Sequence, residues 1–195
     1  MFHCLSCEST AAFNKIRHDK IANVIHTFIS RFCNGVVSQT EEQYHCSTNG
    51  QKKKIDVIIS VGDCTFYIDV SIFNPGCPSH ARVKDESSRE CMSRQEDIKR
   101  SQYEDVFLSN HPNLIPFIID TTGNLGPCAV KFLSDMEDHC NSNIMKSKFL
   151  KAFLTCISVC LCNGLASSSD AFFRLLDEKM ECLVDDAQDS ISDRV

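Results

Sequence analysis

The sequence has no excess of positive charge: 20 Lys and Arg residues stand against 26 Asp and Glu residues, for a formal net charge of −6 at pH 7. A protein that coats DNA by charge alone carries a basic surface, so this balance argues against that class. It does not argue against a nuclease, because a site that holds a divalent metal is itself acidic.

The chain also lacks a long unbroken apolar run. The most apolar stretch, FLKAFLTCISVCLCNGLA, contains Lys151 and is interrupted at Gly164, which favours a buried helix over a membrane span of about 20 residues. The first residues, MFHCLSCEST, have neither the basic start nor the apolar core of a signal peptide. We therefore expect an intracellular protein without membrane contact.

Cysteine, in contrast, is abundant, with 13 in the chain. In a reduced intracellular protein most should be free thiols, and a disulfide scaffold is the less favoured alternative. His3, Cys4 and Cys7 are possible zinc ligands, and Cys4 and Cys7 have the spacing of half a zinc site. Two further ligands are needed and none stands close by, so we expect no bound zinc.

The spacing of apolar residues and of turn residues predicts the order of helices and strands. In chain order we expect a helix over 14–32, a short edge strand around 42–46, strands over 54–60 and 64–73 joined at 61–63, a helix over 82–108, a strand over 114–120, and helices over 127–140, 144–162 and 168–184. The strands over 54–60 and 64–73 form a tight hairpin around Gly62 and Asp63.

This order predicts an α/β or α+β layered domain. The hairpin and the strand over 114–120 should form the centre of a small mixed sheet, flanked by helices and followed by extra C-terminal helices. We find no internal repeat and no linker long enough to divide two domains. The expected parts are an N-terminal segment over 1–13, a core over 14–142, and a helical extension with an acidic tail over 143–195.

Each strand of the predicted hairpin carries one aspartate, Asp56 in the first and Asp69 in the second. Side chains alternate along a strand, so the expected neighbours on each face follow directly. Asp69 shares a face with Tyr67, Ser71 and Phe73, and Asp56 shares a face with Ile58 and Ser60, opposite Ile55, Val57 and Ile59. Whether both acids emerge on the same face depends on the register of the turn, which the sequence leaves open.

Two interpretations of these acids remain open. Each aspartate could lie at a strand end, where it is solvated or caps a turn. Alternatively, Asp56 and Asp69 together could bind a hard cation such as Mg²⁺, which takes one or two carboxylates plus water and substrate phosphate. Such a metal activates water and stabilises the leaving oxygen of a phosphodiester.

The segments around both acids, IDV and then IDVSI, resemble the PD-(D/E)xK nuclease signature, in which the two acids lie on the paired strands of a hairpin. More closely, the chain resembles the restriction-like endonuclease domain that follows the reverse transcriptase in site-specific non-LTR retrotransposon polyproteins. The resemblance covers roughly residues 3–136 and rests on Arg17-His18-Asp19, Lys54-Ile55-Asp56-Val57, Ile68-Asp69-Val70-Ser71-Ile72, Asn74-Pro75, Ile115-Pro116-Phe117-Ile118 and Thr122-Gly123-Asn124-Leu125-Gly126-Pro127.

This resemblance implies a restriction-endonuclease-like core and a DNA endonuclease that uses Mg²⁺ or Mn²⁺ held by Asp56 and Asp69. Ser71 stands where the family signature has its lysine, and Ile55 replaces the proline. In the retroelement nucleases the lysine is displaced onto the following helix. We therefore assign that role to Lys99, which has a tyrosine four residues later, with Lys84 as the second choice. A lysine near the scissile phosphate orients water and offsets developing charge.

Other residues have two possible roles. His18 and Asp19 could approach the metal site or serve the structure of the first helix. Lys52, Lys53 and Lys54 could contact DNA phosphate or be simply solvated.

The resemblance also makes residues 1–13 the remnant of a cysteine-rich knuckle, and the chain a fragment or decayed copy without its reverse-transcriptase partner. A functional nuclease is expected in the nucleus. The alternative function is an inactive remnant that binds DNA or a protein. The DNA target, the metal and the oligomeric state are left open.

Overall fold

The computed structural model describes residues 11–45, 52–74, 87–104, 113–140, 143 and 146–163. Several predictions lie outside these residues: the possible zinc ligands His3, Cys4 and Cys7, the alternative lysine Lys84, and the helix over 168–184.

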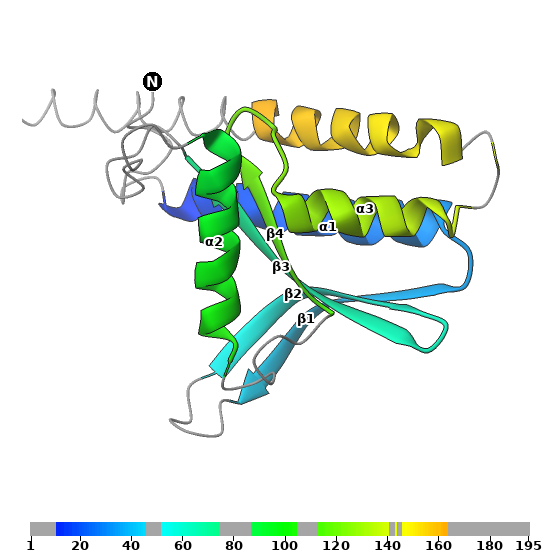
Figure 1. Cartoon of the computed structure of the whole chain (residues 1–195), viewed down its shortest axis with the longest axis horizontal. Coiled ribbons are helices and arrows are strands. Elements are labelled where there is room, and N and C mark those ends of the chain that lie inside the picture. The colour runs from blue at the N-terminus through cyan, green and yellow to red at the C-terminus, as the bar shows by residue number, and fades with distance from the viewer. Residues whose placement is uncertain are drawn as a thin grey trace, which may run out of the picture.

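Helices and strands follow each other in the predicted order (Figure 1). They are α1 (Ala11–Phe32), β1 (Val36–His45), β2 (Lys52–Val61), β3 (Cys64–Phe73), α2 (Ser88–Gln102), β4 (Leu114–Asp120) and α3 (Pro127–Glu137), followed by a helix over residues 146–163. The bounds of β3 and β4 are as predicted. α3 is shorter than expected, and α2 begins at a capping box in which Ser87 and Glu90 bond each other's backbone N–H.

The prediction of a short strand around residues 42–46 is wrong, because β1 is a strand of ten residues that begins at Val36. Its sequence, VVSQTEEQYH, is mostly polar. Within the described sheet β1 pairs on one side only, with β2. An edge strand with an exposed side has no need of the apolar alternation on which strand prediction depends.

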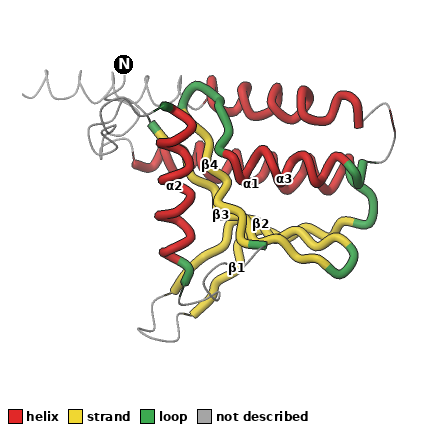
Figure 2. The backbone as a smooth tube through the Cα atoms, viewed as in Figure 1, coloured by secondary structure: helices red, strands yellow, loops and turns green. Residues whose placement is uncertain are grey.

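The four strands form one mixed sheet in the order β1-β2-β3-β4 (Figure 1, Figure 2). The first three strands are antiparallel to their neighbours, and β4 runs parallel to β3. The predicted central hairpin of β2 and β3 is confirmed. The prediction that the strand over 114–120 is also central is wrong, since β4 lies at an edge of the described sheet. Its side chains are nevertheless buried because helices cover both of its faces.

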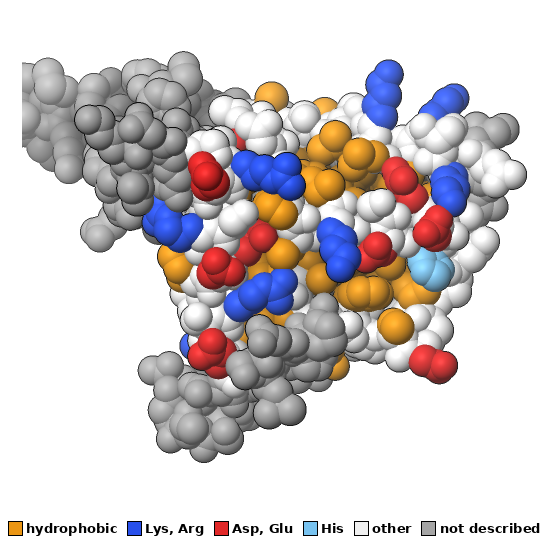
Figure 3. Space-filling view, in the orientation of Figure 1, with side chains coloured by type: hydrophobic (Ala, Val, Ile, Leu, Met, Phe, Trp, Pro, Cys, Tyr) orange, Lys and Arg blue, Asp and Glu red, His pale blue; other side chains and the backbone are white. Residues whose placement is uncertain are grey.

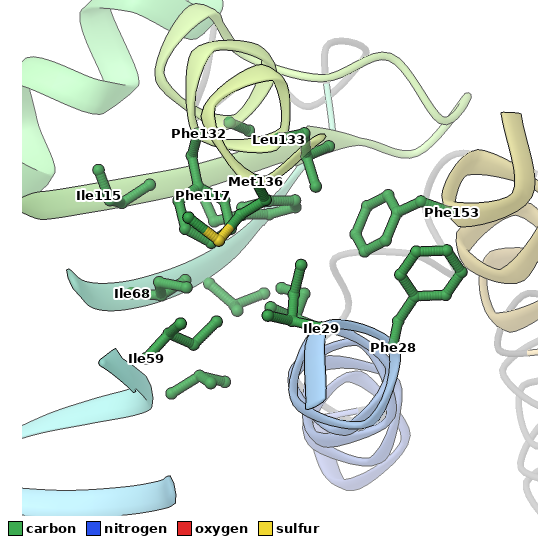
Figure 4. Packing of buried hydrophobic residues seen from close by; sticks show 14 of the residues in the cluster. Phe28, Ile29, Ile59, Ile68, Ile115, Phe117, Phe132, Leu133, Met136 and Phe153 are labelled. Carbon is green, nitrogen blue, oxygen red and sulfur yellow. The ribbon is translucent and has the colours of Figure 1, made fainter. Parts of the chain in front are cut away.

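Alternate residues of β4 identify which helices cover which face. Ile115 and Phe117 join the main core with residues of α1 and α3, whereas Ile118 packs against Cys91 and Met92 of α2. α1 and α3 therefore cover one face, and α2 covers the other. Figure 4 shows the main core, with Phe28 and Ile29 of α1 opposite Phe132 and Leu133 of α3.

The helix over residues 146–163 packs into this same core. Its Phe153 ring lies 5.3 Å from that of Phe28 in α1, nearly perpendicular to it at 80°, and 6.1 Å from that of Phe117 in β4. Figure 4 shows Phe153 beside Phe28, on the side of α1 and α3 away from Ile59 and Ile68. Residues of the predicted C-terminal helical extension thus contribute to the core.

The state of the cysteines and the length of the helices can be compared with the sequence-based expectations. All eight cysteines in the described part of the chain are free thiols, as predicted: Cys33, Cys64, Cys91, Cys128, Cys140, Cys156, Cys160 and Cys162. No helix in the described ranges is both long and apolar enough to cross a membrane.

Candidate active site

The two aspartates lie where the strands of the central hairpin separate. Val61 pairs with Cys64 across a two-residue turn, where Gly62 has a φ of 55°, and pairing of β2 with β3 ends at Val57 and Ile68. Asp56 and Asp69 are each the next residue beyond this last pair. From there β3 continues along β4, and β2 continues along β1. The site is therefore a fork in the sheet.

The predicted alternation of faces fails at one position of this fork. Val57 and Ile59 belong to the main core as expected. Ile55, predicted to share their face, packs instead with Ile58 and Tyr103 in a separate cluster on the α2 side. In the part of β2 that precedes Val57, the strand pairs with β1 alone among the described strands, so this part can twist independently of β3.

Asp56 completes the backbone hydrogen bonding at the fork. Its Oδ2 accepts a hydrogen bond from the N–H of Val70 at 2.8 Å, a group that a continuing β2 ladder would otherwise use. Asp56 is only 8% exposed, so this bond offsets part of the cost of burying the carboxylate. Asp56 thus bonds the backbone of β3 and also lines the cavity described below.

His18 of α1 contacts both Asp56 and Val70 at the fork. Its Nε2 lies 3.2 Å from Oδ2 of Asp56 and 3.1 Å from the carbonyl oxygen of Val70, and its Nδ1 lies 3.2 Å from Oδ1 of Asp19. The hydrogen bond to Asp56 raises the pKa of His18 to about 9 despite partial burial. His18 is therefore a cation beside Asp56 at neutral pH.

Asp69 is held by Lys99 of α2 and by Tyr103, which caps the C-terminus of that helix. Its Oδ1 lies 2.7 Å from the hydroxyl of Tyr103, and its Oδ2 lies 2.9 Å from Nζ of Lys99. The Tyr103 hydroxyl is also 2.6 Å from the carbonyl oxygen of Lys54. Burial and then the charge of Asp69 raise the pKa of Tyr103, so the phenol stays protonated and donates.

Glu96 and Arg100 fix α2 in the orientation that brings Lys99 and Tyr103 to Asp69. Oε1 of Glu96, a residue that is 5% exposed, accepts a hydrogen bond from the N–H of Cys128 in the first turn of α3 at 2.8 Å. Arg100 donates to the carbonyl oxygen of Leu114 at 3.2 Å. α2 therefore has one polar face toward the site and another toward α3 and β4.

Both acids open into one cavity of about 330 Å³. Its lining consists of Arg17, His18, Asp56, Asp69, Val70, Ser71, Ile72 and Lys99. The register question that the sequence left open is thus answered, because the two carboxylates face a common space. Ser71 lies in the cavity but adds no charge, and Lys99 supplies an ammonium group there instead.

Some of the predicted site residues do not line the cavity. Asp19 contacts His18 at its margin, while Lys52, Lys53 and Lys54 lie inside β2, paired with β1, rather than in a loop.

Three residues of the site were not predicted: Arg17, Tyr103 and Glu96. Arg17 stands beside His18 in one of the family-like motifs, and Tyr103 is the tyrosine four residues after Lys99. Glu96 has no sequence signal, because its partner lies 32 residues away.

The donor atoms in this cavity fit a hard cation. The described residues contain no group of three or more His, Cys, Asp and Glu side chains placed to hold a metal. A cation here would therefore take the two carboxylates, the Val70 carbonyl oxygen, water and substrate, which is a donor set suited to Mg²⁺ or Mn²⁺. Oδ2 of Asp69 is buried, and among the described residues it contacts the Lys99 ammonium at 2.9 Å.

A scan against protein-family models and a search of curated proteins find no match to this chain.

Proposed function

We propose that the chain is a metal-dependent DNA endonuclease with a restriction-endonuclease-like core, related to the nuclease domain of non-LTR retrotransposons. One observation carries the proposal: Asp56 and Asp69, on the two strands of the hairpin, face one cavity together with the ammonium group of Lys99. Two acids on the paired strands of a hairpin, with a lysine from the following helix, are the arrangement that the motif resemblance implies.

In this proposal each side chain at the fork has a defined task. Asp56 and Asp69 would hold Mg²⁺ or Mn²⁺ with the carbonyl oxygen of Val70, and the bound metal would supply an activated water and stabilise the leaving oxygen. Lys99 would orient the attacking water and offset charge on the phosphate. Tyr103 would keep the Asp69 carboxylate in place by donating its hydroxyl proton.

The surface gives DNA a limited electrostatic target. On the face seen in Figure 3, basic and acidic side chains of the described residues are interspersed, and no continuous basic stripe is visible there. This agrees with the net charge of −6. DNA binding would then depend on local contacts. Lys54, whose carbonyl oxygen bonds Tyr103 beside Asp69, is a basic residue close to the site that could make one. A functional enzyme would act in the nucleus, in partnership with a reverse-transcriptase domain.

The second candidate function is an inactive remnant that binds DNA or a protein. Ser71 favours it, because the signature position in the cavity has no lysine. A plasmid-nicking assay with Mg²⁺ separates the two functions. Wild type should convert supercoiled plasmid to open circles, Asp69→Asn should not, and Asp63→Asn, an exposed acid in the turn of the same hairpin, should behave as wild type.

Absence of nicking by pure, folded wild-type protein with Mg²⁺ or Mn²⁺ would refute the endonuclease. Equal nicking by Asp69→Asn would trace the activity to a contaminant or to another site.

A further inference from the structure

Two oxygens at the fork share one neighbour, Nε2 of His18. Nε2 lies 3.2 Å from Oδ2 of Asp56 and 3.1 Å from the carbonyl oxygen of Val70. A carboxylate oxygen and a backbone carbonyl oxygen are donors that hard cations take from proteins. The imidazole therefore lies where two of the proposed metal donors converge.

Both ring nitrogens of His18 face hydrogen-bond acceptors. Nδ1 lies 3.2 Å from Oδ1 of Asp19, and Nε2 faces the carboxylate and the carbonyl. A ring nitrogen that carries a hydrogen can donate it to these oxygens, and Nε2 is within reach of two of them at once. In this geometry Nε2 faces protein oxygens that the cation would also need.

We propose that His18 occupies the divalent-cation position of the site and competes with the metal for Asp56 and Val70. The inference rests on the proposed function, since it assumes that this site takes a divalent cation. Mg²⁺ binds oxygen at about 2.0–2.1 Å, well inside the distances from Nε2 to these two oxygens. The ring and the ion therefore cannot use the same side of both donors at once.

The surroundings of His18 allow the ring to leave. His18 is half-buried and lies at the cavity margin, where Asp19, on the same helix, is more exposed to solvent. Its contact with Nδ1 offers the ring a partner outside the donor pair. Asp56 keeps its bond from the Val70 N–H when the ring moves. His18 thus sets how tightly the site binds a cation, whereas the two acids set whether it binds one.

The test is a calorimetric titration of the full-length, metal-free chain with MnCl₂ at neutral pH. Removing the competitor by His18→Ala should tighten Mn²⁺ binding by about tenfold, the scale of losing one group that competes for two of the donor oxygens. His26→Ala is the matched control, because His26 lies on the same helix and bonds Ser38 instead of the fork. Its Mn²⁺ affinity should equal that of wild type.

Each outcome has a distinct meaning. Unchanged affinity in His18→Ala overturns the inference, and weaker affinity overturns it by making His18 a ligand. If Mn²⁺ binds wild type and is lost in Asp56→Asn, either of these results leaves the proposed metal site standing. If Mn²⁺ binds neither wild type nor His18→Ala, the metal site and this inference both fail. Should His18→Ala not fold, His18→Leu fills similar volume without a ring nitrogen and should show the same tighter binding.

Discussion

The hydroxyl of Tyr103, the residue that caps the C-terminus of α2, lies 2.7 Å from Oδ1 of Asp69 in β3. Lys99, in the last turn of α2, contacts the other oxygen of that carboxylate at 2.9 Å. Both oxygens of one acid are thus positioned by the C-terminal end of one helix, and the site depends on where that helix lies.

The first prediction concerns Tyr103 itself. Tyr103→Phe should lower the free energy of unfolding by about 1–3 kcal/mol, because it removes the one hydroxyl hydrogen that the buried Asp69 oxygen and the Lys54 carbonyl share. It should also slow plasmid nicking, because Asp69 is then free to rotate. Urea denaturation measures the first effect. A double-mutant cycle with Asp69→Asn should show coupling between the two side chains; additive free-energy changes would contradict the contact.

Lys99 should be needed for catalysis. Lys99→Ala is expected to reduce the nicking rate by about 100-fold, the scale of losing one group that stabilises the transition state. Its unfolding free energy should fall by about 1–3 kcal/mol, as for Tyr103→Phe, because Oδ2 of the buried Asp69 loses its partner. Single-turnover plasmid nicking and thermal unfolding measure these quantities.

Lys84→Ala is the matched variant for this test, since Lys84 was the other lysine favoured by the sequence. It should nick at the wild-type rate. The reverse result, with Lys84 required and Lys99 dispensable, would move the catalytic lysine to residue 84.

The sequence predicted much of this site because its signals are local. Apolar strand runs located β3 and β4, and the Gly62 turn located the hairpin that places Asp56 and Asp69 beside each other. Lys99 was chosen by its spacing from Tyr103, and the structure brings both residues to Asp69.

What the sequence could not predict depends on contacts between distant segments. The separation of the strands after Val57 and Ile68 is a property of the whole sheet, in which β4 takes over the pairing of β3. The turn of Ile55 toward the α2 side follows from that separation. β1 was mostly missed because its polar residues give no apolar period.

Glu96 provides the third prediction, because it joins α2 to the start of α3. Glu96→Ala should lower the free energy of unfolding by about 1–3 kcal/mol, since it leaves the part-buried N–H of Cys128 without its acceptor. Glu96→Gln keeps an acceptor oxygen and should cost less. A Cβ on Gly126 would lie 2.5 Å from Oε1 of Glu96, so Gly126→Ala should destabilise through the same contact.

Thermal unfolding measures these changes, and Asp97→Ala is the control, an exposed acid next to Glu96 on the same helix. Equal effects of Glu96→Ala and Asp97→Ala would contradict the role of the carboxylate at α3.

The last prediction concerns Asp120, which is 1% exposed at the end of β4. Burial would raise the pKa of Asp120, but hydrogen bonds from Thr122 and Asn124 outweigh it and hold the pKa below its usual range. A carboxyl whose pKa is lower in the folded state stabilises the fold above the unfolded pKa of about 3.9. That contribution is lost as the pH falls through the lowered pKa.

Asp120→Asn should therefore be less stable than wild type at pH 7, and the difference should shrink as the solution is acidified below about pH 4. Urea denaturation between pH 7 and pH 3 measures both quantities. Asp135→Asn, an exposed acid of α3, is the control and should follow the wild-type curve throughout. A gap between wild type and Asp120→Asn that stays constant with pH would mean that the variant acts through packing, not through the charge of Asp120.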